Sequence, residues 1–134
     1  KLFLFNLQLH CRHFRGQEAT SMQPMVGSAA PRDEVWPKLC AALGIPEAPA
    51  EGDRVEATAG DGLGLAGSVV RSQPGAMALL LDSPAPGTAF IAAESHGDGC
   101  GISVWSYLYG PDAASLVARD LPRCNEWLSD FAGA

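Results

Sequence analysis

The chain has 134 residues, 47% of them hydrophobic, and carries a formal net charge of −6. This length fits one domain with a hydrophobic core. This charge, with lysine only at Lys1 and Lys38 and no basic stretch, argues against binding of nucleic acid or of an anionic membrane. No apolar stretch reaches the length of a membrane span, and we expect no transmembrane segment.

The N-terminal stretch does not fit a secretory signal peptide. Asn6, Gln8 and His10 interrupt its apolar residues, and no small-residue cleavage site follows. The chain begins without methionine, which leads us to expect a fragment or a processed product. The four cysteines include no Cys-x-x-Cys pair, and three of them lie in apolar patterns. We therefore expect reduced thiols and a cytoplasmic location.

Residues 1–16 fit two patterns. Residues 5–11 alternate between apolar and polar side chains, which is the period of a strand. One face of a helix is equally well filled by a set of apolar residues at helical spacing, namely Leu4, Leu7, Cys11 and Phe14. The same spacing recurs near the C-terminus at Leu121, Cys124, Leu128 and Phe131. This recurrence favours an N-terminal helix that is the end of a preceding domain copy, with the domain proper spanning residues 17–134.

Residues 17–27 predict a short first strand that Pro24 interrupts or confines to an edge. A helix follows, with Asp33 as a candidate cap and Gly44 as its C-terminal stop. Residues 45–52, which contain two prolines, are predicted to form a loop.

Five short strands separated by turn signals then follow one another. They are predicted at residues 54–59, 64–72, 76–82, 88–96 and 100–109. Consecutive strands on short loops indicate an antiparallel meander. Gly62, Gly64 and Gly67 match the G-x-G-x-x-G pattern, but the residues after them read as a strand. A nucleotide site needs a helix there, so we assign these glycines to a hairpin or a bulge.

The last thirty residues combine an aromatic strand with a long amphipathic helix. The helical pattern runs from Asp112 to Phe131, and Pro122 is expected to kink it or to mark a cap. Its apolar stripe is Ala113, Val117, Leu121, Cys124, Leu128 and Phe131. We predict an α+β fold in which an antiparallel sheet of about six strands wraps around this C-terminal helix, with an extra N-terminal helix.

Few motifs indicate chemistry. His10, Cys11 and His13 lie close in sequence, but no further ligands with metal-site spacing accompany them, so we expect no metal and no cofactor. Glu94 and His96 share one face of a strand and are weak candidates for acid–base catalysis. Their alternative role is as solvent-exposed residues at a strand end.

The order of elements resembles the SRPBCC, or START-like, helix-grip superfamily, and is most similar to homologues of the activator of heat-shock protein 90 ATPase. The resemblance rests on segments similar to that family's first helices, late strands and closing helix, namely residues 28–36, 87–94, 104–110, 125–131 and 5–14. It implies a cavity between sheet and helix that holds apolar or amphipathic molecules.

This resemblance leads to three hypotheses. The first is non-catalytic binding of a small hydrophobic molecule, with Trp36, Phe90, Trp105 and Tyr107 as the cavity wall. The second is an interaction module that binds a protein partner, or a second copy, through residues 1–16. The third is a polyketide cyclase-like enzyme using Glu94 and His96, which requires both side chains to face the cavity. An open pocket of a few hundred Å³ would favour the first, and a filled core the second.

Overall fold

A seven-stranded antiparallel sheet forms the centre of the molecule. The computed structural model describes residues 2–14, 16, 19–59 and 63–133. The strands are β1 (Thr20–Met22), β2 (Met25–Ser28), β3 (Arg54–Ala59), β4 (Leu63–Gln73), β5 (Ala76–Ser83), β6 (Gly87–His96) and β7 (Gly99–Leu108). Their order is β1-β7-β6-β5-β4-β3, and β2 also pairs with β7. The predicted meander is therefore confirmed, with strand boundaries within one residue of those expected.

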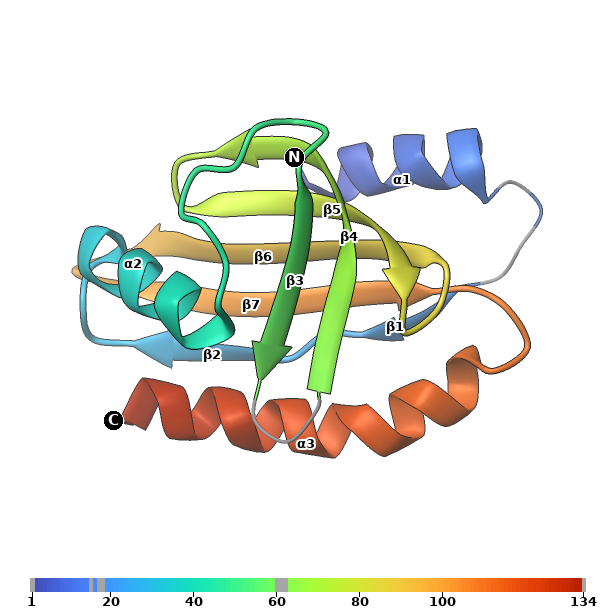
Figure 1. Ribbon diagram of the computed structural model, residues 1–134. Helices are drawn as coiled ribbons and strands as arrows, with labels where there is room; N and C mark the ends of the chain where they lie inside the picture. The colour runs from blue at the N-terminus through green and yellow to red at the C-terminus, as the bar shows by residue number, and fades with distance from the viewer. Residues whose placement is uncertain (1, 15, 17–18, 60–62, 134) are drawn as a thin grey trace.

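The first strand is divided in two, as the position of Pro24 predicted. β1 and β2 pair in succession along β7, and the Pro24 carbonyl accepts a hydrogen bond from the backbone N–H of Val104 between them. Toward the other edge of the sheet, the pairing of β4 with β5 contains two register shifts, which increase the curl of these strands. Figure 1 shows the result, in which β3 and β4 cross in front of β5, β6 and β7.

Gly67 lies at one of these shifts. A Cβ at this position would collide with the backbone carbonyl of Leu80 on β5, so only glycine allows the two strands to approach there. The register shift between Ala66 and Gly67 leaves Asp82 on β5 as the extra residue, so the expected bulge lies on the strand opposite this glycine. The hairpin expected at residues 60–62 lies outside the described residues.

Helix α2 (Arg32–Leu43) covers part of the inner face of the sheet. It begins after Pro31 as the N-cap, and Asp33 lies within the first turn, so the expectation that Asp33 caps the helix was wrong. Its carboxylate still lies near the positive end of the helix dipole. The helix continues through Pro37 and ends at Gly44, whose φ of 72° is the left-handed conformation that the predicted stop requires.

Helix α3 (Ala113–Gly133) lies along the edge formed by β1 and β2 and reaches β4 (Figure 1). It is a single helix that continues through Pro122. The predicted stripe is confirmed, because four of its residues are buried and Leu121 and Phe131 pack against the core as partly buried residues. Together α2, α3 and the inner face of the curled sheet enclose one large apolar cluster.

Helix α1 (Leu2–His13) packs on the opposite, outer face of the sheet. Leu9 joins a second apolar cluster there with Ala78 and Phe90, and Phe14 stacks on Tyr109 with ring centroids 4.0 Å apart. The helix was predicted, but the predicted face was not the buried one, since Leu7 is 49% exposed and Cys11 is exposed. The equivalent positions of α3, Cys124 and Leu128, are buried. The comparison with α3 therefore predicted the helix but not its orientation.

Candidate functional site

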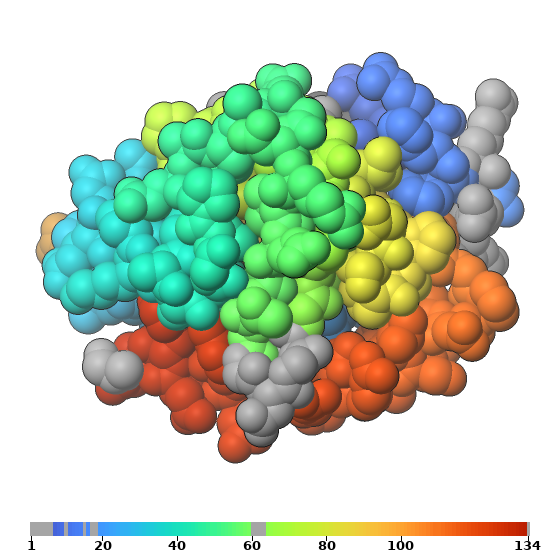
Figure 2. All heavy atoms as spheres, viewed as in Figure 1, coloured from blue at the N-terminus to red at the C-terminus, as the bar shows by residue number. Residues whose placement is uncertain are grey.

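The inner cluster contains a small cavity between the sheet and α3. Its volume is about 30 Å³, and its walls are apolar side chains such as Met22, Leu43 and Ile91 together with the carboxyl group of Asp120 and the thiol of Cys124. This volume is close to that of one water molecule in the liquid. The interior is therefore filled by side chains rather than hollow. Figure 2 shows the side chains of α2, β3 and β4 packed above α3 on the visible face.

A larger groove of about 340 Å³ opens to solvent beside this cavity. It lies between β3, β4, the end of β5 and α3, and the two hollows have lining residues in common. The shared residues are Ala57, Gly64, Leu65, Pro84 and Asp120. Only one layer of side chains therefore separates the groove from the apolar interior. We call the five shared residues the mouth.

Asp120 is the charged side chain at the mouth. Its side chain is 6% exposed, and Arg119 binds it through two hydrogen bonds, Nε to Oδ1 at 2.7 Å and Nη2 to Oδ2 at 2.9 Å. Arg123 adds a longer contact of 3.7 Å. These contacts neutralise a carboxylate that would otherwise be costly to bury.

Two further polar groups lie on the inner side. Burial raises the pKa of the Cys124 thiol to about 11, and the nearby Asp120 charge contributes. Ser106, which pairs in register with Met22 of the cavity wall, has a buried hydroxyl with no hydrogen-bond partner among the described residues. The interior is thus apolar with a few polar atoms close to the mouth.

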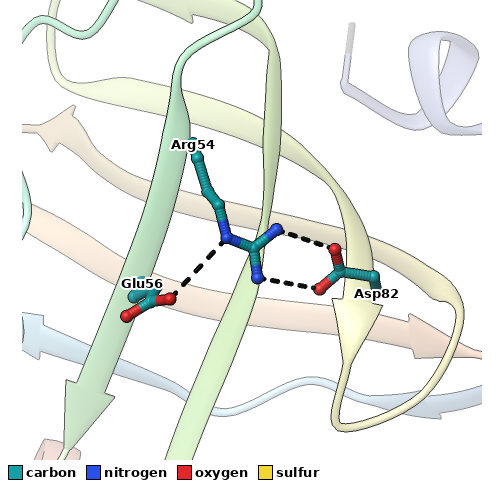
Figure 3. Close-up of polar contacts among 3 residues, drawn as sticks. All are labelled: Arg54, Glu56 and Asp82. Carbon is teal, nitrogen blue, oxygen red and sulfur yellow. Dashed lines mark hydrogen bonds and ion pairs between the residues drawn. The ribbon is translucent and has the colours of Figure 1, made fainter.

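The outer rim of the groove carries a second charged group, drawn in Figure 3. Arg54 on β3 binds Asp82 on β5 through two hydrogen bonds of 2.7 and 3.2 Å, and contacts Glu56 at 3.6 Å. The hydrogen bond from Arg54 lowers the pKa of the Asp82 carboxyl. All three residues are exposed, so solvent screens their attraction, and the group orients the rim more than it stabilises the fold.

Comparison with known proteins identifies the fold. No family model matches the sequence, and no curated protein matches it either. A protein of Mesorhizobium loti is similar in structure, with a TM-score of 0.60 and 15% identity over 84% of this chain and 96% of its own. A polyketide cyclase-like protein of Corynebacterium glutamicum gives a TM-score of 0.57 at 11% identity, over 86% of this chain and 90% of its own.

The Aha1 dimer of Colwellia psychrerythraea is also similar, with a TM-score of 0.54 and 10% identity over 84% of this chain and 90% of its own. Each of these structures superposes on 84–86% of this chain, so they share its overall arrangement of strands and helices. The chain has an α+β helix-grip fold. None of its described helices is both long and apolar enough to cross a membrane.

The helix-grip fold places the four predicted wall residues in two different layers. Trp36 lies in the inner cluster, and its indole N–H donates to the backbone carbonyl of Glu47. Phe90, Trp105 and Tyr107 lie in the outer cluster beneath α1. None of the four residues therefore lines the cavity between the sheet and α3, and Trp36 instead lines a separate groove of about 630 Å³ beside α2.

Glu94 and His96 also lie on the outer side of the helix-grip sheet. They lie four and six residues after Phe90 on β6, on the same face of the strand, and both are exposed. The condition set for cyclase-like chemistry, that both side chains face the interior, is not met. Phe90, Trp105, Glu94 and His96, which the sequence assigned to two separate hypotheses about the inner cavity, line one groove on the outer face.

Asp120 is the residue of the helix-grip interior that sequence reasoning missed. A signal was present, since Asp120 lies three residues after Val117 and four before Cys124, on the buried stripe of α3. A carboxylate in such a stripe, with Arg119 and Arg123 beside it, is typical of a paired internal charge.

Proposed function

We propose that the protein binds a small, uncharged amphipathic molecule at the mouth, without catalysis. The observation that carries the proposal is the set of residues that the solvent groove and the apolar cavity share. The helix-grip fold, also seen in a polyketide cyclase-like protein, supports a site between the sheet and α3.

The sizes of the two hollows determine how such a molecule lies. The groove of about 340 Å³ falls within the range of small-molecule pockets, whereas the cavity of about 30 Å³ lies far below it. The polar part of the ligand and most of its volume therefore occupy the groove. Only an apolar end passes Leu65 and Ala57 toward the interior.

The charged residues of the groove around the mouth favour an uncharged polar head. Arg54 and Arg119 are both bound by carboxylates, Asp82 and Asp120. A charged head would have to break one of these pairs. A hydroxyl or carbonyl group can instead form hydrogen bonds with their outer edges.

Thermal-shift measurements with medium-chain monoacylglycerols and hydroxylated polycyclic aromatic compounds test the proposal. A ligand present at about 100 times its Kd stabilises the folded state by about 2.7 kcal/mol. Ala57→Leu narrows the passage and is expected to abolish the stabilisation, while Leu65→Ala widens it and is expected to strengthen binding. Stabilisation by none of these compounds, or equal stabilisation of all variants, would contradict the proposal.

The control for the widened variant is Leu39→Ala. Leu39 is fully buried in α2 and does not line the cavity, and its truncation removes the same number of atoms. Both substitutions cost about 2–5 kcal/mol of stability. Only Leu65→Ala is expected to change ligand affinity, so the comparison separates binding from general loosening of the core.

The filled interior favours a second candidate function, an interaction module. Leu7 on α1 is 49% exposed, which provides an apolar contact on the outside of the molecule. The Aha1 structure of Colwellia psychrerythraea is a dimer. Sedimentation of the wild type and of Leu7→Glu tests this candidate, which requires a dimer that the substitution dissociates.

A further inference from the structure

A groove of about 460 Å³ lies on the outer face of the sheet, on the opposite side from the mouth. Its lining comes from β2, the last residues of β6, and β7, and includes Phe90, Trp105, Met25 and Glu94. α1 packs over the same face at the outer cluster, where Leu9 contacts the layer of Phe90 and Trp105. This groove is larger than the one at the mouth, and nothing in the proposed function uses it.

The groove is hollow because its floor has glycine where a strand ordinarily carries a side chain. Gly27 on β2 pairs with Gly101 on β7, and Gly101 pairs on its other side with Glu94 on β6. The adjacent outward position on β7 is the small residue Ser103. A row of missing and short side chains thus runs between Trp105 on one side and His96 on the other.

Neither glycine is required by the backbone. A Cβ built at Gly27 or Gly101 meets no atom within 4 Å, and neither residue has a positive φ. Gly67, Gly87 and Gly99 differ, because a Cβ at each of them would collide with a backbone carbonyl of a neighbouring segment. Glycine weakens a strand interior, so an unforced glycine pair indicates that the space above it is used.

The lining residues determine which class of ligand this groove can bind. Trp105 and Phe90 are aromatic, Met25 is 65% exposed and adaptable, and Glu94 supplies a carboxylate. No lysine or arginine occurs among the described lining residues. The Trp105 indole N–H is buried without a partner among the described residues, which marks this edge as incompletely satisfied. The register places Glu94 opposite Gly101, four residues along β7 from Trp105, which is about 13 Å. A carboxylate toward one end of the groove and an aromatic ring toward the other favour a cation that carries an apolar body.

We propose that this outer groove, opened by the Gly27–Gly101 pair, is a binding site for an organic cation with an aromatic or apolar body. The ammonium group lies at the Glu94 carboxylate, and the apolar body extends from it toward the Trp105 ring. The body lies over Gly101 and Ser103, against Met25.

Titration with phenethylammonium, followed by the three indole N–H signals in a nitrogen–proton correlation spectrum, tests the proposal. The signal of Trp105 is expected to shift on titration, while those of Trp36 and Trp127, which pack in the inner layer, stay in place. The neutral analogue 2-phenylethanol is expected to bind more weakly. Glu94→Gln is expected to weaken phenethylammonium binding about two- to fivefold, the range of an exposed ion pair, and to leave 2-phenylethanol unaffected.

Gly101→Val is the decisive variant, because it fills the groove without straining the backbone. We expect this variant to keep or raise the melting temperature and to lose the Trp105 response. Ser68→Val, at an exposed position of β4 that does not line the groove, is the matched control and keeps the response.

Three outcomes would overturn the proposal. They are no shift of the Trp105 signal with either probe, equal affinity for the charged and the neutral probe, and an unchanged response in Gly101→Val. If Gly101→Val lowers the melting temperature, Glu94→Gln and the neutral probe still decide the result. Loss of binding at the mouth leaves this site unaffected, since Ala57→Leu does not touch the outer face.

Discussion

Asp120 shows how a single buried charge is accommodated in an apolar layer. Its side chain lines the cavity together with Leu65 and Cys124, and it pairs with Arg119 at 2.7 Å. Arg119 itself stays largely in water. The pair therefore costs less than a fully buried ion pair, since only one partner gives up its solvation.

Removing Arg119 should therefore be more harmful than removing an equally exposed arginine elsewhere. Arg119→Ala leaves Asp120 buried with only the 3.7 Å contact to Arg123, whereas Arg54→Ala releases Glu56 and Asp82 into solvent. We expect a clear loss of stability in urea for Arg119→Ala and a small, salt-sensitive loss for Arg54→Ala. Equal losses would show that Asp120 is already adequately solvated.

For individual residues, the sequence predicted which side chains are apolar better than it predicted the face toward which they point. Trp105 and Tyr107 alternate on β7 with Val104 and Leu108, so both faces of the strand are apolar and either could be the inner one. Only the contact with α1, which covers the outer face, settles the direction. Glycine at position 101 had no detectable role until its surroundings were known.

α1 determines how the outer layer is protected. It turns Leu9 toward the sheet and leaves Leu7 and Cys11 toward solvent. Phe14, just after the helix, extends the contact by stacking on Tyr109 at an interplanar angle of 5°. Two residues therefore hold the described part of α1 on the domain, and their loss should uncover Phe90 and Tyr107.

The two leucines of α1 give a matched pair of variants. Leu9→Ala removes a side chain that is 4% exposed and should cost about 2–3 kcal/mol, measured by chemical denaturation. Leu7→Ala removes one that is 49% exposed and should change stability by less than about 0.5 kcal/mol. Similar costs for the two would mean that α1 is not docked in this orientation.

Helices and strands were predictable where a single spacing of apolar residues dominated the sequence. The strands from β3 to β7 have turn signals on both sides, and their boundaries followed from these. The buried face of α1 did not follow, because its apolar residues occupy several faces and its burial depends on the shape of the sheet beneath it. The split between β1 and β2 followed from Pro24 alone.

The whole molecule has three layers, with α2 and α3 inside the curl of the sheet and α1 outside it. Small residues on the inner face, such as Ala57, Ala89 and Ala93, let the helices approach closely and leave little free volume. The fold was predictable from the order of elements. The volume between its layers was not, because it depends on how each side chain fills the curvature of β4.

The inner layer also makes stability sensitive to alkaline pH. Burial raises the pKa of Cys40 to about 12 and that of Cys124 to about 11, from the ordinary value of 9.0. A group whose pKa is raised on folding contributes fully below its unfolded pKa, and this contribution is lost as the pH rises through the folded value. Stability should therefore decline from pH 9.0 toward pH 11.

Denaturation curves across this pH range check the prediction. Cys40→Ala and Cys124→Ala are expected to flatten the decline, although each lowers stability at neutral pH by removing a buried group. Cys11→Ala, at an exposed position, is the control and should keep the slope of the wild type. A slope that none of the three variants alters would assign the decline to other groups.

Tyr109 occupies the junction between the two sides of the molecule. Its ring supports Phe14 on the outside, and its backbone N–H donates to the carbonyl of Pro86 at the turn before β6. The next residue, Gly110, has a φ of 102° and redirects the chain into α3. The attachment of the outer helix and the starting point of the closing helix thus share one residue. A substitution of Tyr109 is therefore expected to affect both the attachment of α1 and the start of α3.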